Sequence, residues 1–262
     1  MTLPPDLHEI LIPSTVDGSA EPCLCHLPPG DASVPLLVGL HTWSADRFNQ
    51  IEAMLPRCRE RGWALILPEF RGPNLTTNPR ARQAGGSDLA RQDILDALDH
   101  LVGQGRIDRR QVYLLGGSGG GHMALLMAAR APDRFTAVSA WVPITDLIAW
   151  HGENPNYTPH VEAVCGGPPG TSDEVDAEYR ERSPLTHLEA MRRARLAVHH
   201  GRYDRSVPYN HTWRLAQALE AVGAPRFYLD LFDGGHEIRY DVAFAWFDAC
   251  SRQDSAGEAL TG

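Results

Sequence analysis

A serine flanked by glycines stands near the middle of the sequence. The segment Gly116–Gly121 reads GGSGGG; it follows the apolar run 111–117 and precedes a helical stretch at 122–130. A sharp strand–serine–helix turn exposes the serine hydroxyl at the edge of a sheet. Glycines two positions before and after the serine let chain segments pass closely without a Cβ clash. We therefore predict that Ser118 is a nucleophile.

Two other interpretations of this glycine run are a flexible turn and a phosphate-binding loop. A Walker-type loop carries a lysine followed by serine or threonine after its last glycine, whereas His122 and Met123 follow here. A dinucleotide-binding fingerprint belongs to the first strand of its unit, and this run comes after several strands. Both observations favour the nucleophile.

A serine hydroxyl is a poor nucleophile at neutral pH, so it needs a base, and the base needs an orienting carboxylate. HHGRYDRSVP, at the end of the apolar run 194–201, offers Asp204, and DGGHE, after the run 226–232, offers His236. The order serine, acid, histidine is the one expected after such a turn. The sequence therefore predicts a triad of Ser118, Asp204 and His236.

Other acidic and histidine residues compete for these roles. Asp233 falls in the turn that leaves the run 226–232, where a turn-forming role is favoured. Packing, core or turn roles are favoured for three histidines near the apolar runs: His122, His199 and His200. A solvated surface position is the default for His151, His160 and His187.

The tetrahedral intermediate of acyl transfer needs hydrogen-bond donors for its oxyanion. One is expected to be the backbone N–H of Gly119, the residue after the nucleophile. The other should come from the loop His41–Ser44, which follows the first apolar central run. We favour the N–H of Trp43, with Thr42 second. The Trp43 ring either packs or also forms a wall of the acyl pocket.

The elements around these residues alternate between strands and helices. Residues 7–12 and 20–27 read as short strands joined by a turn at Asp17-Gly18. Apolar runs typical of buried strands occupy 34–41, 63–70, 111–117, 135–142, 194–201 and 226–232. Helical patterns occupy 48–61, 88–104, 122–130, 210–222 and 237–251. This alternation predicts an α/β fold with a mostly parallel sheet covered by helices on both faces.

One connection is too long to be a plain loop. Residues 146–192 are polar and contain Pro155, Pro159, Pro168, Pro169 and Pro184. We interpret this segment as a cap or lid inserted into a single domain of residues 1–262. Trp141, Trp150 and Thr42 are candidate substrate-binding residues near it. An aromatic and polar mixture suits a carbohydrate or aromatic acyl ester, although packing of the cap explains it equally well. Residues 252–262 are predicted to be a frayed tail.

The composition limits the kinds of partner that the protein is expected to bind. The chain has 262 residues, a formal net charge of -9 and a pI near 5.7, which disfavours nucleic acid. It shows no signal peptide and no apolar run long enough for a membrane span. Five cysteines without a secretory signal favour the cytoplasm. Cys23 and Cys25 lack a second ligand pair at zinc-site spacing, so we expect no metal and no cofactor. The composition leaves open whether the protein forms a homo-oligomer.

Five motifs together resemble a known family: GGSGGG, PEFRG at the end of the run 63–70, SPLTHL before 194, HGRYD-x-x-VP and GGHE. They resemble the catalytic domain of the prolyl oligopeptidase family, and they are similar to dienelactone-hydrolase-like esterases of the same α/β-hydrolase superfamily. The resemblance covers roughly residues 34–250. It implies an α/β-hydrolase fold with Ser118 as nucleophile, Asp204 as acid and His236 as base. Dienelactone hydrolases proper use cysteine, and this chain has serine.

The chain departs from the family pattern in two places. Peptidases of that family carry a large N-terminal β-propeller, whereas only residues 1–33 precede the first central run. The histidine-glycine-glycine type of oxyanion loop is replaced by His41-Thr42-Trp43. Both departures favour a stand-alone esterase that cleaves a carboxylic ester through an acyl-enzyme. The alternative is a serine peptidase or acylaminoacyl hydrolase. A non-catalytic binding protein is the weaker alternative, because such proteins normally lack a triad member.

Overall fold

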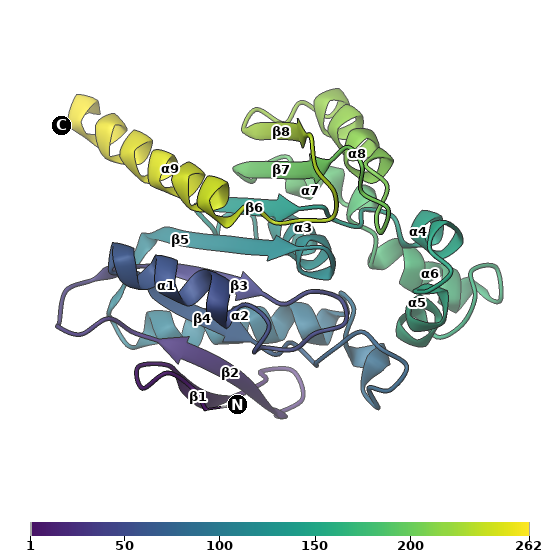
Figure 1. Cartoon of the computed structure of the whole chain (residues 1–262), viewed down its shortest axis with the longest axis horizontal. Coiled ribbons are helices and arrows are strands. Elements are labelled where there is room, and N and C mark those ends of the chain that lie inside the picture. Colours follow the sequence, from purple (N-terminus) through teal and green to yellow (C-terminus); the bar gives the residue numbers. More distant parts are fainter. Residues whose placement is uncertain (1, 262) are drawn as a thin grey trace.

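The computed structural model describes the backbone of residues 2–261 and the side chains of residues 2–252 (Figure 1). Its centre is an eight-stranded sheet in the order β1-β2-β4-β3-β5-β6-β7-β8. The strands are β1 (His8–Pro13), β2 (Ala20–His26), β3 (Val34–Leu40), β4 (Ala64–Pro68), β5 (Ile107–Gly117), β6 (Ala137–Trp141), β7 (Leu196–Gly201) and β8 (Phe227–Phe232). β2 pairs antiparallel with both β1 and β4, and the six strands from β3 to β8 run parallel to one another.

The solidly apolar runs became the central strands because both faces of a parallel sheet are covered. All residues of β4, β6 and β7 are buried. The chain begins the parallel part at β3, adds β4 on one side, and then crosses to β5 on the other side. The strand order therefore reverses between β3 and β5. Ligands of open α/β sheets bind at such a switch point, outside the carboxyl ends of the strands.

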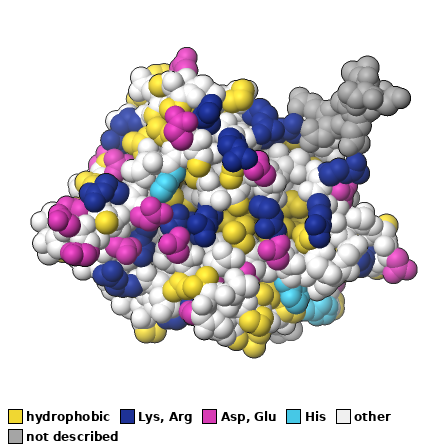
Figure 2. All heavy atoms as spheres, turned by 180° about the vertical axis from the view of Figure 1, so that it is seen from behind, with side chains coloured by type: hydrophobic (Ala, Val, Ile, Leu, Met, Phe, Trp, Pro, Cys, Tyr) yellow, Lys and Arg dark blue, Asp and Glu magenta, His cyan; other side chains and the backbone are white. Residues whose placement is uncertain are grey.

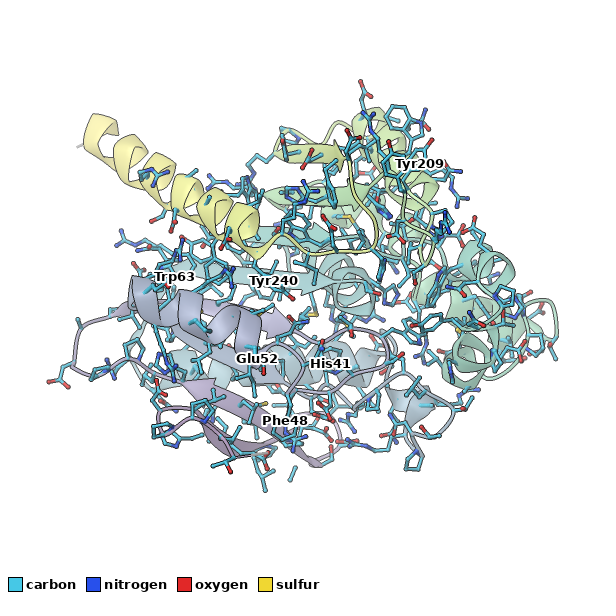
Figure 3. All side chains as sticks on the ribbon, in the orientation of Figure 1. His41, Phe48, Glu52, Trp63, Tyr209 and Tyr240 are labelled. Atoms are coloured by element: carbon cyan, nitrogen blue, oxygen red, sulfur yellow. The ribbon has the colours of Figure 1, made fainter. Side chains whose placement is uncertain are left out.

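Two layers of helices enclose the sheet. One core lies under α1 (Ile51–Arg61) and α9 (Tyr240–Thr261). The other core lies under α2 (Asp88–Gly103), α3 (Gly119–Arg130), α7 (Leu188–Met191) and α8 (Asn210–Ala221). Figure 3 shows Tyr240 at the start of α9 above α1, and its hydroxyl donates a 2.6 Å hydrogen bond to Gln50. The predicted fold class is thereby confirmed.

The segment that the sequence marks as a cap is mostly helical. It contains α4 (Leu147–Glu153), α5 (Thr158–Cys165), α6 (Asp173–Glu181), the 3₁₀ turn η2 (Pro184–Thr186) and α7. A second 3₁₀ turn, η1 (Ala81–Gln83), contacts α5. Asp146 and Ser172 cap α4 and α6 by accepting hydrogen bonds from backbone N–H groups. In Figure 1, α4, α5 and α6 lie beyond the carboxyl ends of the strands.

The frayed tail expected from Arg252 to Gly262 stays a prediction. The backbone of α9 is assigned as helix through Thr261, and Gly262 lies outside the described residues.

The surface carries charges of both signs. Figure 2 shows basic and acidic side chains interspersed over the rear face, with hydrophobic groups between them. Among the helices that the structure describes, none combines the length and the apolar character needed to cross a membrane.

Candidate active site

Ser118 has the backbone geometry of an exposed nucleophile. It joins the end of β5 to the start of α3 with φ 56° and ψ -121°, a region that residues with a Cβ rarely adopt. Its N–H donates to the carbonyl of Trp141 at 2.8 Å, and its carbonyl accepts from the N–H of His122 at 2.9 Å. The surrounding structure therefore holds a strained turn in place, as is common at functional sites.

The glycines around Ser118 are required by close backbone contacts. A Cβ on Gly116 would lie 2.2 Å from the carbonyl oxygen of Gly120. A Cβ on Gly120 would lie 2.7 Å from the carbonyl oxygens of Leu40 and His41. Any side chain at either position would push α3 away from β5 or from the end of β3. The spacing seen in the sequence is thus a packing requirement of the turn.

Asp204 lies in the loop after β7, and its side chain is fully buried. Its Oδ1 accepts hydrogen bonds from the backbone N–H groups of Ser206 and Val207 at 2.8 and 2.9 Å. Its Oδ2 lies 2.7 Å from Nδ1 of His236. Burial by itself raises the pKa of Asp204. Contacts with His200 and His236 outweigh burial and hold that pKa well below its usual range. The carboxylate is therefore ionised and orients the imidazole.

His236 lies in the loop between β8 and α9, where two contacts fix its position. A Cβ on Gly201 would lie 2.1 Å from the carbonyl oxygen of Gly235, so this loop packs against the end of β7. A Cβ on Gly117 would lie 2.2 Å from the side chain of Ile238, so the same loop also packs beside the residue before the nucleophile. The His236 side chain is 29% exposed, which leaves it open to a substrate.

The protonation of His236 follows from its partner. Nδ1 faces a carboxylate, which only accepts hydrogen bonds, so Nδ1 carries a hydrogen. In the neutral ring Nε2 then keeps its lone pair. This is the tautomer that a general base for a serine hydroxyl requires.

The predicted oxyanion donors lie side by side. A Cβ on Gly119 would lie 2.4 Å from the backbone nitrogen of Trp43, so the loop after β3 touches the start of α3. Gly119 is the first residue of α3, where an N–H has no acceptor within the helix. Within the described residues, the Trp43 N–H also has no hydrogen-bond acceptor. The N–H of Thr42, the second choice, already donates to Asn49 at 3.2 Å.

His41 supports this loop, a role that the sequence did not indicate. Its Nδ1 lies 2.9 Å from the carbonyl oxygen of Thr42, and its Nε2 lies 2.9 Å from that of Glu69. Its ring stacks on Phe70 with centroids 3.8 Å apart. Figure 3 shows His41 near the end of β3. Burial lowers the pKa of His41. Its two ring nitrogens face carbonyl oxygens of the loops after β3 and β4, so the ring links these loops.

The proposal of Trp141 as a substrate-binding residue needs correction. Trp141 is fully buried in the core beneath α9, where its ring stacks on His199 with centroids 4.0 Å apart. Its Nε1 donates to the hydroxyl of Ser139 at 2.9 Å. The strand alternates its side chains between two faces, and position 141 points into this core instead of toward the rim.

Trp150 is also buried, but in a cluster close to the site. This cluster, which we call the cap core, contains Trp43, Ile144, Leu147, Trp150, Val161, Val164, Cys165, Val175, Tyr179 and Val207. The rings of Trp43 and Trp150 meet edge to face with centroids 4.8 Å apart. Residues from the oxyanion loop and the acid loop thus share one core with the cap helices. The packing alternative considered for Trp150 matches this position.

Several other histidines also hold the cap in place. His122, directly after the glycine run, is buried, and its Nε2 lies 2.6 Å from the carbonyl oxygen of Arg182. Burial lowers the pKa of His122 to about 4. His151 lies 2.9 Å from Glu162, and His160 accepts from the N–H of Thr76 at 3.1 Å. The cap histidines therefore form internal contacts that a purely solvated position would lack.

Comparison with known proteins identifies the family and several relatives of this chain. A model of the prolyl oligopeptidase family matches residues 58–252. An acylamino-acid-releasing enzyme of Arabidopsis thaliana is 27% identical over 202 residues, which cover 71% of this chain and 24% of that protein. Dipeptidyl aminopeptidase BIII of Pseudoxanthomonas mexicana is 29% identical over 219 residues, which cover 79% and 30%. The chain thus spans about a quarter of the length of these relatives.

A solved structure shows the same fold. The acylaminoacyl peptidase of Pyrococcus horikoshii superposes with a TM-score of 0.74 at 18% identity, over 92% of this chain and 41% of that one. Such low identity supports the architecture alone. The family match spans well over half of the chain and includes the segments that carry Ser118, Asp204 and His236. The chain therefore belongs to the prolyl oligopeptidase family.

Proposed function

We propose that this protein is a serine peptidase that cleaves amide bonds near the ends of short peptides through an acyl-enzyme. The observation that carries the proposal is the contact between Nδ1 of His236 and Oδ2 of Asp204, in loops packed beside the strained turn of Ser118. The family supplies the substrate class, because the relatives named above are an acylamino-acid-releasing enzyme and a dipeptidyl aminopeptidase.

In the proposed mechanism, Nε2 of His236 takes the hydroxyl proton of Ser118 as the oxygen attacks the acyl carbon. Asp204 holds the ring in the required tautomer and stabilises the imidazolium. The N–H groups of Gly119 and Trp43 donate to the oxyanion. His236 then protonates the leaving amine, and the amine departs. A water molecule, deprotonated by the same ring, hydrolyses the acyl-enzyme and regenerates Ser118.

The sequence favoured an ester hydrolase over a peptidase, and the comparisons support the peptidase better. The same residues attack esters and amides, but an amine leaves only after it is protonated. The departure at His41-Thr42-Trp43 removes no donor, since the oxyanion contact uses the backbone N–H of Trp43 and not a particular side chain. This departure therefore does not weigh against amide hydrolysis.

A matched pair of substrates tests the proposal. N-acetyl-alanine p-nitroanilide and N-acetyl-alanine p-nitrophenyl ester share one acyl part and differ in the leaving group. We expect the wild type to cleave both, and Ser118→Ala to lose about three orders of magnitude or more in kcat/KM on each. Ser33→Ala, an exposed serine before β3, is the matched control.

The result of the substrate pair separates the candidate functions. The protein would be an ester hydrolase and not a peptidase if it cleaved the ester but neither this anilide nor the anilide of a dipeptide with a free amino group. Labelling with a fluorophosphonate gives an independent readout, because it should modify Ser118 and leave Ser118→Ala unmodified. Equal labelling of both proteins would show that another residue is the nucleophile.

A further inference from the structure

A second histidine faces the carboxylate of Asp204. His200 lies on β7, four residues before Asp204, and its side chain is fully buried. Its Nε2 lies 2.8 Å from the carbonyl oxygen of Val207 and 3.3 Å from Oδ2 of Asp204. Both oxygens only accept hydrogen bonds, so Nε2 carries a hydrogen. His200 therefore contacts both the carboxylate and the turn that holds it.

The other nitrogen of His200 has a partner that fixes the tautomer. Nδ1 lies 2.5 Å from the hydroxyl oxygen of Thr212, which is fully buried on α8. The hydroxyl can donate to Nδ1 while Nε2 donates to Val207 and Asp204. A buried imidazole with one proton satisfies all of these contacts at less cost than a buried charge. Helix α8 thus sets the orientation of the ring.

The contact of His200 reaches the same oxygen that orients His236. Oδ2 of Asp204 receives Nδ1 of His236 on one side and Nε2 of His200 on the other. Oδ1 is occupied by two backbone N–H groups. Each donor draws negative charge away from the carboxylate oxygens. The attraction that Asp204 exerts on a protonated His236 therefore depends on how firmly His200 is held.

We propose that His200 is a positioning residue, which fixes the orientation of Asp204 and moderates the basicity of His236 through the shared Oδ2. The inference rests on the proposed function, since it assigns to His236 the role of general base. His200 itself touches neither the substrate nor the reacting atoms. It acts through a chain of contacts from the Thr212 hydroxyl to His200, then to Asp204, then to His236.

Other charged groups near this chain of contacts sit in exposed positions. Arg202, at the start of the acid loop, lies 3.9 Å from Asp233, and Arg239 pairs with Glu237 at 2.8 Å. Arg205 follows Asp204. The charged cap residue Glu153 is already paired with His211 on α8 at 2.8 Å. In the described structure, the side chains that face the carboxylate of Asp204 within contact distance are therefore His200 and His236.

Three substitutions distinguish the hydrogen-bond donor of His200 from the packing of its ring. His200→Leu removes both ring nitrogens and keeps a bulky apolar side chain. His200→Gln keeps an N–H donor near the position of Nε2. Thr212→Val removes the hydroxyl that fixes the tautomer and leaves the His200 ring in place. The three variants are combined with Ser118→Ala for titration and are studied alone for kinetics.

The decisive measurement is the titration of the His236 ring by NMR in the Ser118→Ala background. We expect the midpoint to rise by about half a pH unit in His200→Leu, because Asp204 keeps more charge for the protonated ring. His200→Gln should restore most of the parent value, and Thr212→Val should shift the midpoint in the same direction by less. In His200→Leu alone, the acid limb of the pH profile of kcat/KM should also move to higher pH. In this variant kcat should fall roughly ten-fold, with KM nearly unchanged.

The proposal is overturned if the titration of His236 in a folded His200→Leu variant matches that of the parent. If His200→Leu does not fold, the proposal is overturned when the His236 titration midpoint is the same in Thr212→Val and in the parent. The NMR titration needs no turnover, so it stands apart from the proposed function. A shifted titration in a protein that hydrolyses no substrate supports His200 and rejects the peptidase. An unshifted titration of His236 in an enzyme that cleaves the peptide substrate supports the peptidase and rejects the role of His200.

Discussion

The indole Nε1 of Trp150 donates a hydrogen bond to the backbone carbonyl of Ser206 at 2.9 Å, and this contact ties the cap to the loop of the catalytic acid. The side-chain amide of Asn154 donates to the same oxygen at 2.9 Å. The N–H of Ser206 in turn donates to Oδ1 of Asp204. Val207 completes the link, because its side chain belongs to the cap core. The cap therefore braces the acid loop as well as covering the rim.

Loss of the Trp150 donor should weaken this brace. Trp150→Phe keeps an aromatic ring and removes Nε1, so we expect the free energy of unfolding to fall by about 1 kcal/mol or more. kcat should fall more than KM changes, because the orientation of Asp204 affects the chemical step. Urea denaturation and steady-state kinetics measure the two effects. Trp213→Phe, at an exposed position on α8, is the control. If both variants behave alike, the acid loop holds its shape without the cap.

Relief of backbone strain at the nucleophile should stabilise the protein. Ser118 has a positive φ, which glycine adopts without a Cβ penalty. We expect Ser118→Gly to be inactive, yet more resistant to unfolding than Ser118→Ala by about 1 kcal/mol. Thermal and chemical unfolding of the two inactive variants provide the comparison. A glycine variant less stable than the alanine variant would mean that the turn carries no strain.

A methyl group on Gly119 should impair the oxyanion site without touching the triad. Its Cβ would lie within 2.8 Å of three atoms of Trp43, including the backbone nitrogen. The loop after β3 must then move, so we expect Gly119→Ala to lose about two orders of magnitude in kcat. Gly103→Ala, where a Cβ meets nothing within 4 Å, is the control on α2. Retained labelling of Ser118 by a fluorophosphonate, at a reduced rate, would show that the fold is intact.

The lowered pKa of Asp204 predicts how stability depends on pH. A carboxyl whose pKa is lower in the folded state stabilises the fold above its unfolded pKa, and this contribution is lost as pH falls toward the folded pKa. We therefore expect wild type to be more stable than Asp204→Asn at pH 5–7. The margin should shrink below about pH 4, the ordinary value for aspartate. Urea denaturation across this range measures the margin. A margin that stays constant down to pH 3 would contradict the assignment.

The sequence by itself determined the fold class and was enough to predict the three residues of the proposed triad. The solidly apolar runs specify strands that must be buried on both faces, and their alternation with helical patterns leaves a parallel sheet as the solution. The carboxyl ends of parallel strands share one rim, so residues that follow β5, β7 and β8 had to gather there. Ser118, Asp204 and His236 could be chosen because each follows such a strand in the expected chain order.

Only the tertiary structure decided which neighbours support these residues. The assignment of Trp141 to the substrate was wrong because a side chain at a strand end can point to either face, and local sequence does not fix which. The contacts of His200 with Asp204, and of Trp150 with Ser206, join segments whose spatial proximity depends on how β7, α8 and the cap pack together. Hydrogen bonds of this kind are set by distances in three dimensions, and the pattern of apolar and polar residues carries no record of them.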